Sequence, residues 1–171
     1  MRAEDGNPIE KAKLAKDATA AFNDVYTFAA AVRAGEMDWE DVEKMDMNTR
    51  LKWVGLVHRD KRTPGRFMMR LRLPNGVTNA DSFRFYADSV EPHGPDLGVI
   101  DITTRQNIQL RGVQLEQADE IIDGLHARGQ TSFHSALDNV RNMVGSPLAG
   151  IDCLEMVGHA PLLPRPAINC Q

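Results

Sequence analysis

The chain contains the stretch Arg66-Phe67-Met68-Met69-Arg70-Leu71-Arg72-Leu73-Pro74-Asn75-Gly76, and this stretch decides the fold that we expect. From residue 66 to residue 73 the odd-numbered positions are all apolar, and arginines occupy three of the four even-numbered positions. This alternation is typical of a β-strand that buries one face. The Pro-Asn-Gly sequence then predicts a turn. We therefore expect a strand at 66–73 with apolar side chains on one face and guanidinium groups on the other.

The segments that follow this strand predict an α+β domain over residues 51–138. The expected elements are, in chain order, a helix capped by Thr78 that runs to about Val90, a strand at 97–103, a strand at 108–113, a helix at 116–128 and a further strand within 131–138. Together with the strand at 66–73, they give the ferredoxin-like split βαβ order. Trp53, Met68 and Met69 are predicted to belong to the core.

A helical segment over residues 1–50 is expected to precede this domain. Residues 8–34 are mostly strong helix formers with apolar side chains at helical spacing, and Gly35 is placed to end the helix. Asp38 can cap a short second helix at about 39–44. At the other end of the chain, three prolines predict an irregular tail over residues 158–171.

The composition is that of a globular protein. With 171 residues, 42% of them hydrophobic and 26% charged, the chain can bury one core. A net charge of -4 without blocks of Lys and Arg argues against nucleic acid as a partner, and the apolar runs are too short for membrane insertion. Cys153 and Cys170 lack metal-binding spacing and the five histidines are scattered, so no metal site is expected.

Guanidinium and amide side chains are concentrated on segments that are also predicted to form the core. In an extended backbone one face would carry Thr103, Arg105, Asn107, Gln109 and Arg111. A turn near residues 105–106 would weaken this alignment. With the arginines at 66, 70 and 72, these side chains can supply forked donors for carboxylates, which favours an anionic ligand. The alternative is a sheet face that simply contacts water. No acidic residue alternates with these arginines on their own strands, and this favours the ligand.

A polar loop is predicted at residues 138–147, where Asp138-Asn139-Val140-Arg141-Asn142 leads to a Gly-Ser-Pro sequence. Asparagine side chains in such loops bond to nearby backbone groups. The loop can therefore either cap the sheet or bind a ligand, and the residues alone leave both possibilities open.

Four motifs occur in a fixed order along the chain. They are Arg50-Leu51-Lys52-Trp53-Val54-Gly55-Leu56, the stretch from Arg66 to Thr78, Thr103-Thr104-Arg105-Gln106-Asn107-Ile108-Gln109-Leu110-Arg111-Gly112-Val113, and Asp138-Asn139-Val140-Arg141-Asn142 continuing to Gly145 and Pro147-Leu148-Ala149-Gly150-Ile151-Asp152. Together they resemble the ferredoxin–nitrite reductases, from about Pro8 to Val157. The sister sulfite reductases match these motifs less well.

The resemblance implies the amino-terminal part of an assimilatory enzyme that reduces nitrite to ammonium with six electrons from ferredoxin. It implies a sirohaem bridged to a [4Fe–4S] cluster, a sirohaem-binding domain that begins at residues 139–157, and a location in the chloroplast stroma or the bacterial cytoplasm. Arg70 and Arg141 match the arginines that bind nitrite beside the sirohaem. The residues implied to hold the sirohaem are Thr103, Thr104, Arg105, Gln106, Asn107, Gln109, Arg111 and Asn139, with Arg66 and Arg72 as weaker candidates.

The chain departs from the family pattern at the cluster. The cysteines that hold the cluster and two lysines of the distal pocket lie in the other half of family members, and Cys153 and Cys170 match neither their region nor their spacing. We therefore expect a partial sirohaem pocket that is inactive alone, with the cluster supplied only by a carboxy-terminal half. The alternatives are a catalytically dead relative that serves as a structural or binding subunit of a larger redox assembly, and a sulfite reductase half.

Overall fold

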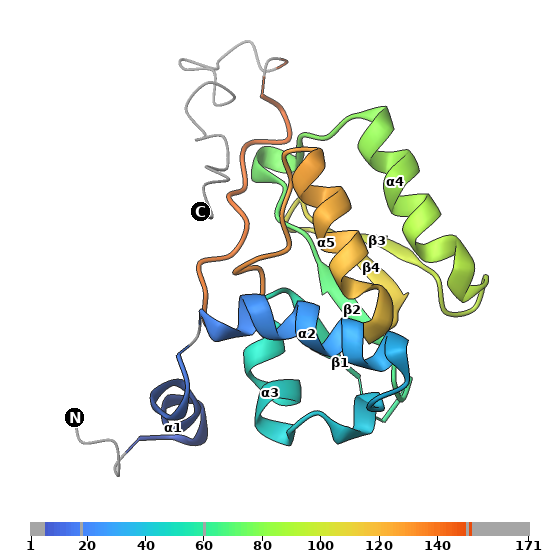
Figure 1. Cartoon of the computed structure of the whole chain (residues 1–171). Coiled ribbons are helices and arrows are strands. Elements are labelled where there is room, and N and C mark those ends of the chain that lie inside the picture. The colour runs from blue at the N-terminus through green and yellow to red at the C-terminus, as the bar shows by residue number, and fades with distance from the viewer. Residues whose placement is uncertain (1–5, 18, 60, 150, 152–171) are drawn as a thin grey trace.

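The computed structural model describes residues 6–17, 19–59, 61–149 and 151. Helices and short strands alternate along the chain and are joined by turns (Figure 1). In chain order they are α1 (Pro8–Ala15), α2 (Ala20–Ala34), α3 (Lys44–Asn48), β1 (Leu56–His58), β2 (Phe67–Arg70), α4 (Ala80–Val90), β3 (Ile100–Ile102), β4 (Ile108–Val113) and α5 (Ala118–Ala127). The tail predicted at 158–171 and both cysteines lie outside the described residues.

The strands form one antiparallel sheet in the order β1-β2-β4-β3. Met69 pairs with Leu56 on one side and with Leu110 on the other, and Leu110 pairs with Ile100, so these apolar side chains form a row on one face. Helices α4 and α5 cover this face (Figure 1). The predicted α+β fold is confirmed.

The alternation at 66–73 determines which side chains the sheet buries. The odd-numbered residues are each at most 2% exposed, namely Phe67, Met69, Leu71 and Leu73. Burying a large apolar side chain contributes roughly 2 kcal/mol, so this row is a major source of stability. Met68 on the opposite face is also buried, as is Trp53, which confirms both as core residues.

The N-terminal segment forms two helices where the sequence predicted one over residues 8–34. Lys16 has an extended backbone (φ -150°, ψ 139°) that ends α1, and Asp17 caps the backbone two residues further on (2.9 Å). The break allows Lys16 to form ion pairs with Asp24 on α2 and with Asp46 on α3. These contacts between helices explain an interruption that helical periodicity does not predict.

Two helix starts differ in detail from the sequence prediction. Helix α4 is capped by Asn79, whose side chain accepts a hydrogen bond from the first helical turn (2.8 Å), and not by Thr78. Asp38 forms the predicted cap in a reciprocal capping box. It caps only the 3-10 turn Trp39–Asp41, however, and the predicted helix at 39–44 does not form as one element.

The further strand predicted within residues 131–138 is absent from this part of the described chain. Thr131 makes a single isolated bridge to Arg72. Positive φ angles at His134 (56°) and Leu137 (61°) then turn the chain out of the extended conformation. The fourth strand of the sheet is β1, which the sequence shows only as a short apolar run.

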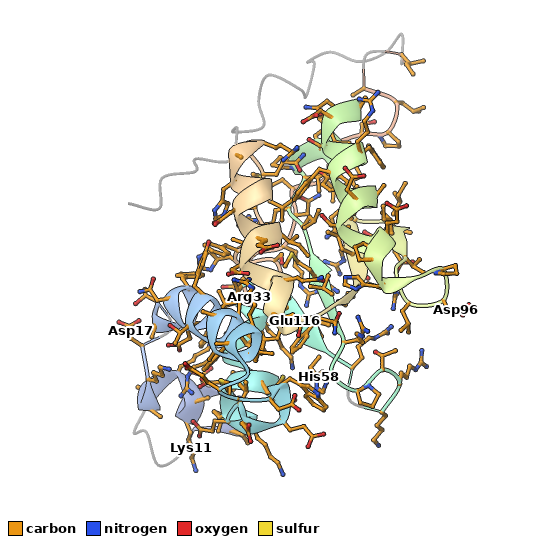
Figure 2. All side chains as sticks on the ribbon, turned by 45° about the vertical axis from the view of Figure 1, so that its right-hand side comes forward. Lys11, Asp17, Arg33, His58, Asp96 and Glu116 are labelled. Carbon is orange, nitrogen blue, oxygen red and sulfur yellow. The ribbon has the colours of Figure 1, made fainter. Side chains whose placement is uncertain are left out.

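The N-terminal helices and the sheet share one hydrophobic core. Val25 of α2 and Met47 of α3 belong to the same buried cluster as Ile122 of α5. Figure 2 shows Arg33 of α2 beside Glu116, which precedes α5, and the Arg33 guanidinium donates to the Glu116 carbonyl (2.6 Å). The helical segment and the α+β domain are therefore packed together, and the predicted boundary between them stays a prediction.

Candidate anion-binding site

Three arginines gather where the uncovered face of the sheet meets the loop that follows α5. Arg70 ends β2, Arg105 lies in the β3–β4 turn and Arg141 lies in the loop. Burial lowers the pKa of Arg70, and the nearby charges of Arg141 and then Arg105 lower it further. The Arg70 Nε is buried without a hydrogen-bond partner, and no carboxylate among the described residues pairs with any of the three arginines. The cluster is therefore a concentration of uncompensated positive charge.

The backbone of Arg70 is fixed by groups that lie far from it in sequence. Its N–H donates to the Gly55 carbonyl (3.0 Å), and its own carbonyl accepts a hydrogen bond from the Ser135 hydroxyl (2.7 Å). Gly55 has φ +89°, and a Cβ at this position would lie 2.5 Å from the Ser132 carbonyl oxygen. Only glycine fits there without displacement. Gly55 and Ser135 thus position Arg70, and sequence analysis did not select either of them as a site residue.

Residues 103–107 form a tight turn, so the predicted single face from Thr103 to Arg111 does not exist. Thr103 N–H donates to the Asn107 carbonyl (3.0 Å), and Gln106 has φ +55°. The Thr103 hydroxyl also donates to Asn107 Oδ1 (2.6 Å), which leaves Asn107 buried and engaged within the turn. The turn near residues 105–106 is confirmed. Gln109 and Arg111 alone remain on the strand, with Gln109 directly opposite Arg70.

Arg111 has an acidic partner that the sequence pattern on its own strand did not reveal. It forms an ion pair with Asp101, which lies on the neighbouring strand β3. Asp101 is paired with Gln109 across the sheet, so Asp101, Gln109 and Arg111 share the uncovered face. Arg111 is thus charge-compensated, unlike Arg70.

Arg66 and Arg72 lie outside the cluster of uncompensated charge. The Arg66 guanidinium donates to the Gly112 carbonyl (3.1 Å) and contacts His93 Nδ1 (3.1 Å), so it is engaged at the other end of β2. Arg72 is half-buried beyond the end of β2, where its backbone N–H donates to the Thr131 carbonyl (2.8 Å). The Arg66 contacts hold its side chain at the other end of β2 from Arg70, and Arg72 is not among the charges that lower the pKa of Arg70.

The loop that carries Arg141 is attached to the β3–β4 turn by side-chain amides. Asn142 Nδ2 donates to the carbonyl oxygens of Arg105 (2.9 Å) and Gln106 (3.0 Å). Asn139 Nδ2 donates within its own segment to the Ala136 carbonyl (2.8 Å). Thr104 is exposed at the turn. Asn142 was quoted in the loop motif but was not selected as a site residue, although an asparagine beside an arginine is a usual source of such backbone contacts.

Three of the residues predicted to hold sirohaem line a separate pocket of about 300 Å³. Thr103, Gln106 and Asn107 form part of its wall, beside apolar residues such as Leu73 and Phe83. The arginines of the cluster do not line it. The predicted residues therefore divide between a cationic surface and a mainly apolar pocket.

The family model for the nitrite/sulfite reductase ferredoxin-like half domain matches residues 59–128. A curated relative, the chloroplastic ferredoxin–nitrite reductase of Zea mays, is 49% identical to this chain over 156 residues. The chain carries the half domain of the nitrite and sulfite reductases. The resemblance found in the sequence is thereby confirmed, for a chain that corresponds to an amino-terminal part of much longer relatives.

The chain is similar to plant, cyanobacterial and mycobacterial proteins over almost its whole length. The alignment with the Zea mays protein covers 91% of this chain and 27% of the relative, and the ferredoxin–nitrite reductase of Synechococcus elongatus is 45% identical over 92% of this chain and 29% of its own length. The solved structure of Mycobacterium tuberculosis NirA superimposes with a TM-score of 0.74 at 24% identity, covering 90% of this chain and 30% of that one, which shows the shared fold. The chain thus spans less than a third of the length of these relatives.

Two further kinds of feature are absent from the residues that the structure describes. No helix there is long and apolar enough to cross a membrane. Likewise, no group of three or more His, Cys, Asp or Glu side chains in those same residues is arranged to hold a metal ion.

Proposed function

We propose that this chain is the amino-terminal part of an assimilatory ferredoxin-dependent nitrite reductase, and that Arg70, Arg105 and Arg141 bind the anions of its reaction. One observation supports this proposal above the others: the three guanidinium groups lie together without a carboxylate partner among the described residues. Like charges at short range repel, and an anion placed between them reverses the sign of that interaction.

Sirohaem fits this arrangement because it is a polycarboxylate. Forked guanidinium donors bind carboxylates with two parallel hydrogen bonds, and the buried Nε of Arg70 offers a donor that no described group uses. When bound and coupled to a [4Fe–4S] cluster, sirohaem supplies the redox chemistry that reduces nitrite to ammonium with six electrons from ferredoxin. Residues of a carboxy-terminal half would hold the cluster, so we expect residues 1–171 alone to be inactive.

Each residue has a role that follows from its position. Arg70 and Arg141 would bind nitrite and stabilise negative charge as it develops, because both are uncompensated and the charge of Arg141 acts on Arg70. Arg105 would bind a carboxylate of the sirohaem from the exposed turn, with Thr104 and Gln109 as further contacts. Arg111 would contribute less charge because Asp101 neutralises it. Arg66 and Asn139 are weak candidates, since their side chains make structural contacts. Arg72 is weak because it is not among the charges that act on Arg70.

The names of the relatives support the proposed partners and compartment. They describe ferredoxin-dependent nitrite reductases that are chloroplastic in plants and also occur in cyanobacteria. We accordingly propose nitrite as substrate, ferredoxin as electron donor, a carboxy-terminal half as partner, and the chloroplast stroma or bacterial cytoplasm as location.

Reconstitution tests the proposal. The purified chain is mixed with sirohaem, with and without the separately produced carboxy-terminal part of the Synechococcus elongatus relative, and the visible spectrum and dithionite-driven nitrite loss are recorded. We expect the chain to shift the sirohaem absorption band whenever it is added, and nitrite loss only when both parts are present. If both parts together neither shift the band nor remove nitrite, the chain is a structural or binding relative and not an enzyme half. Faster loss of sulfite than of nitrite would instead indicate a sulfite reductase half.

Arginine variants then test the assigned roles. In the reconstituted enzyme, Arg70→Met and Arg141→Met should each lower the rate of nitrite loss about a hundredfold, since each removes a preorganised donor to developing charge. Arg84→Met is the matched control, because Arg84 is an exposed arginine on α4 with no contact to the cluster, and it should leave the rate unchanged. Equal rates for all three variants would remove Arg70 and Arg141 from the site.

A further inference from the structure

We propose, on the basis of the anion site described above, that Gln106 and Asn142 are positioning residues that hold Arg141 against the other two arginines. We call these two residues the clamp. The Asn142 amide nitrogen donates to two successive carbonyls of the β3–β4 turn, those of Arg105 (2.9 Å) and Gln106 (3.0 Å). Because Asn142 directly follows Arg141 in the chain, these contacts attach the loop beside Arg141 to the backbone of the β3–β4 turn that carries Arg105.

The Gln106 side chain makes the reverse connection from the turn to the loop. Its Nε2 donates to the Gly145 carbonyl (3.0 Å), and its Oε1 accepts from the Gly145 N–H (3.0 Å). This pair of contacts binds one peptide residue in the way that a neighbouring strand would. The loop is thus attached at both ends of residues 142–145, once by each residue of the clamp.

The path of residues 142–145 is also fixed from its other side. The Asn75 N–H donates to the Met143 carbonyl (2.9 Å). A Cβ at Gly145 would lie 1.8 Å from Asn75 Oδ1, so the backbone passes against this side chain with no room to spare. With Asn75 on one side and Gln106 on the other, the segment has one available position.

Arg141 needs this attachment because its own contacts are weak. Its side chain is exposed, and its hydrogen bond to the Leu137 carbonyl is long (3.3 Å). The charge of Arg70 repels it. The clamp therefore opposes the repulsion, so that the donors are in place before an anion binds.

The clamp residues are poorly suited to touch the ligand themselves. Both polar atoms of the Gln106 amide already have partners in Gly145, and the Asn142 nitrogen uses its two hydrogens on two carbonyls. Asn142 Oδ1 is buried without a partner among the described residues, which is a cost of keeping the amide in this orientation. Gln106 is thereby reassigned from a direct contact of the cofactor to a residue that acts through Arg141.

A double-mutant cycle separates these two roles in the purified full chain. The probe is uroporphyrin, a metal-free porphyrin with eight carboxylates, and its dissociation constant is measured by fluorescence titration. Gln106→Asn keeps an amide and suits the positive φ at this position but is too short to reach Gly145. We expect Gln106→Asn and Asn142→Ala each to bind uroporphyrin roughly tenfold more weakly.

The decisive comparison is made in the Arg141→Ala background. If Gln106 and Asn142 act through Arg141, their substitution there changes the dissociation constant no further. Effects that add fully would mean direct contact with the porphyrin and would overturn the assignment. Asn23→Ala is the control, since Asn23 is an exposed amide on α2 that lies outside both the β3–β4 turn and the loop at 138–147, and it should bind uroporphyrin like the wild type.

Hydrogen exchange keeps the clamp testable if the wild-type chain binds no porphyrin, an outcome that would count against the proposed function. The Gly145 amide should be protected in the wild type and in Asn23→Ala, and should lose its protection in Gln106→Asn. Unchanged protection in Gln106→Asn would overturn the clamp, whatever the porphyrin result.

Discussion

The guanidinium groups of Arg50 and Arg70 are surrounded by opposite charges. Arg50 is 4% exposed and pairs with Asp46 (2.5 Å) while also donating to a carbonyl of α1 (3.1 Å). Arg70 is half-buried, and the charges close to it are those of Arg105 and Arg141. Each guanidinium leaves its Nε buried without a partner, so the difference lies in the charge around it.

The surrounding charge distinguishes a structural arginine from an arginine that binds a ligand. A buried ion pair that is complete within the chain contributes to the packing of α1 against α3. A half-buried arginine surrounded by like charge costs stability, and a fold retains such a residue when it binds something. The chain therefore retains Arg70 at the expense of its own stability.

The largest effect is expected when Arg50 and Arg70 are each replaced by methionine. Arg50→Met leaves the Asp46 carboxylate buried, with Lys16 at 3.9 Å as its remaining cation, and should lower the free energy of unfolding by about 3 kcal/mol. Arg70→Met removes a repelled charge and keeps the apolar stem, so it should not lower stability. Urea unfolding followed by circular dichroism measures both values. Equal losses for the two variants would show that Arg70 is also a structural arginine.

A smaller effect is expected from two glycines with similar backbones but different surroundings. A Cβ added at Gly35 (φ +72°) would have nothing within 4 Å, whereas Gly55 (φ +89°) supports Arg70 and a Cβ there would have three atoms within 2.9 Å. Gly35→Ala should cost about 1 kcal/mol for the left-handed conformation alone. Gly55→Ala should cost roughly 2 kcal/mol more, because a backbone carbonyl has to move.

Thermal unfolding of the two alanine variants measures this difference in stability. The binding of uroporphyrin gives a second measurement, because it depends on the position of Arg70. Since the Gly55 carbonyl accepts the Arg70 N–H, displacement at Gly55 should also weaken the binding of uroporphyrin, while Gly35→Ala should not. Similar losses of stability for both glycines would mean that the loop at residues 132–135 yields easily and does not fix Arg70.

The sequence predicted the parts of this fold that depend on local periodicity. The strand predicted at 66–73 forms over Phe67–Arg70, and it was recognised because its alternation directly reflects burial. β4 was placed at its observed bounds for the same reason. Interruptions that depend on distant partners were missed. The break at Lys16 requires Asp24 and Asp46. The loss of a strand at 131–138 follows from hydrogen bonds to the carbonyls of Trp53, Val54 and Arg70.

The candidate site shows the same limit. Arg70 and Arg141 were selected through motif resemblance, and the structure brings them together. The parity argument for residues 103–111 failed because it assumed one extended segment, whereas hydrogen bonds between Thr103 and Asn107 close a turn. The ion pair of Arg111 with Asp101 was missed because it joins two strands. Side chains that act through backbone contacts, such as Asn142, carry no charge pattern that a sequence reveals.

The smallest effect concerns Arg66. The group beside it is neutral, so the charge around Arg66 is intermediate between the negative charge beside Arg50 and the positive charges beside Arg70. Its guanidinium faces His93 Nδ1 (3.1 Å), and burial, together with the Arg66 charge, lowers the pKa of His93. The folded chain therefore binds fewer protons there than the unfolded chain, whose histidine titrates at about 6.5. The stability due to the neutral imidazole is present above that pH and is lost as the pH falls through it toward the lower folded value.

Replacing His93 with glutamine removes this titration while keeping a polar side chain beside Arg66. The free energy of unfolding of the wild type should fall more between pH 7.5 and pH 5.5 than that of His93→Gln, although His126, whose pKa burial also lowers, keeps part of the dependence in both. Urea unfolding at the two pH values gives the difference. If the variant loses as much stability as the wild type, protonation of His93 beside Arg66 does not destabilise the fold. The neutral imidazole would then not distinguish the surroundings of Arg66 from those of Arg70.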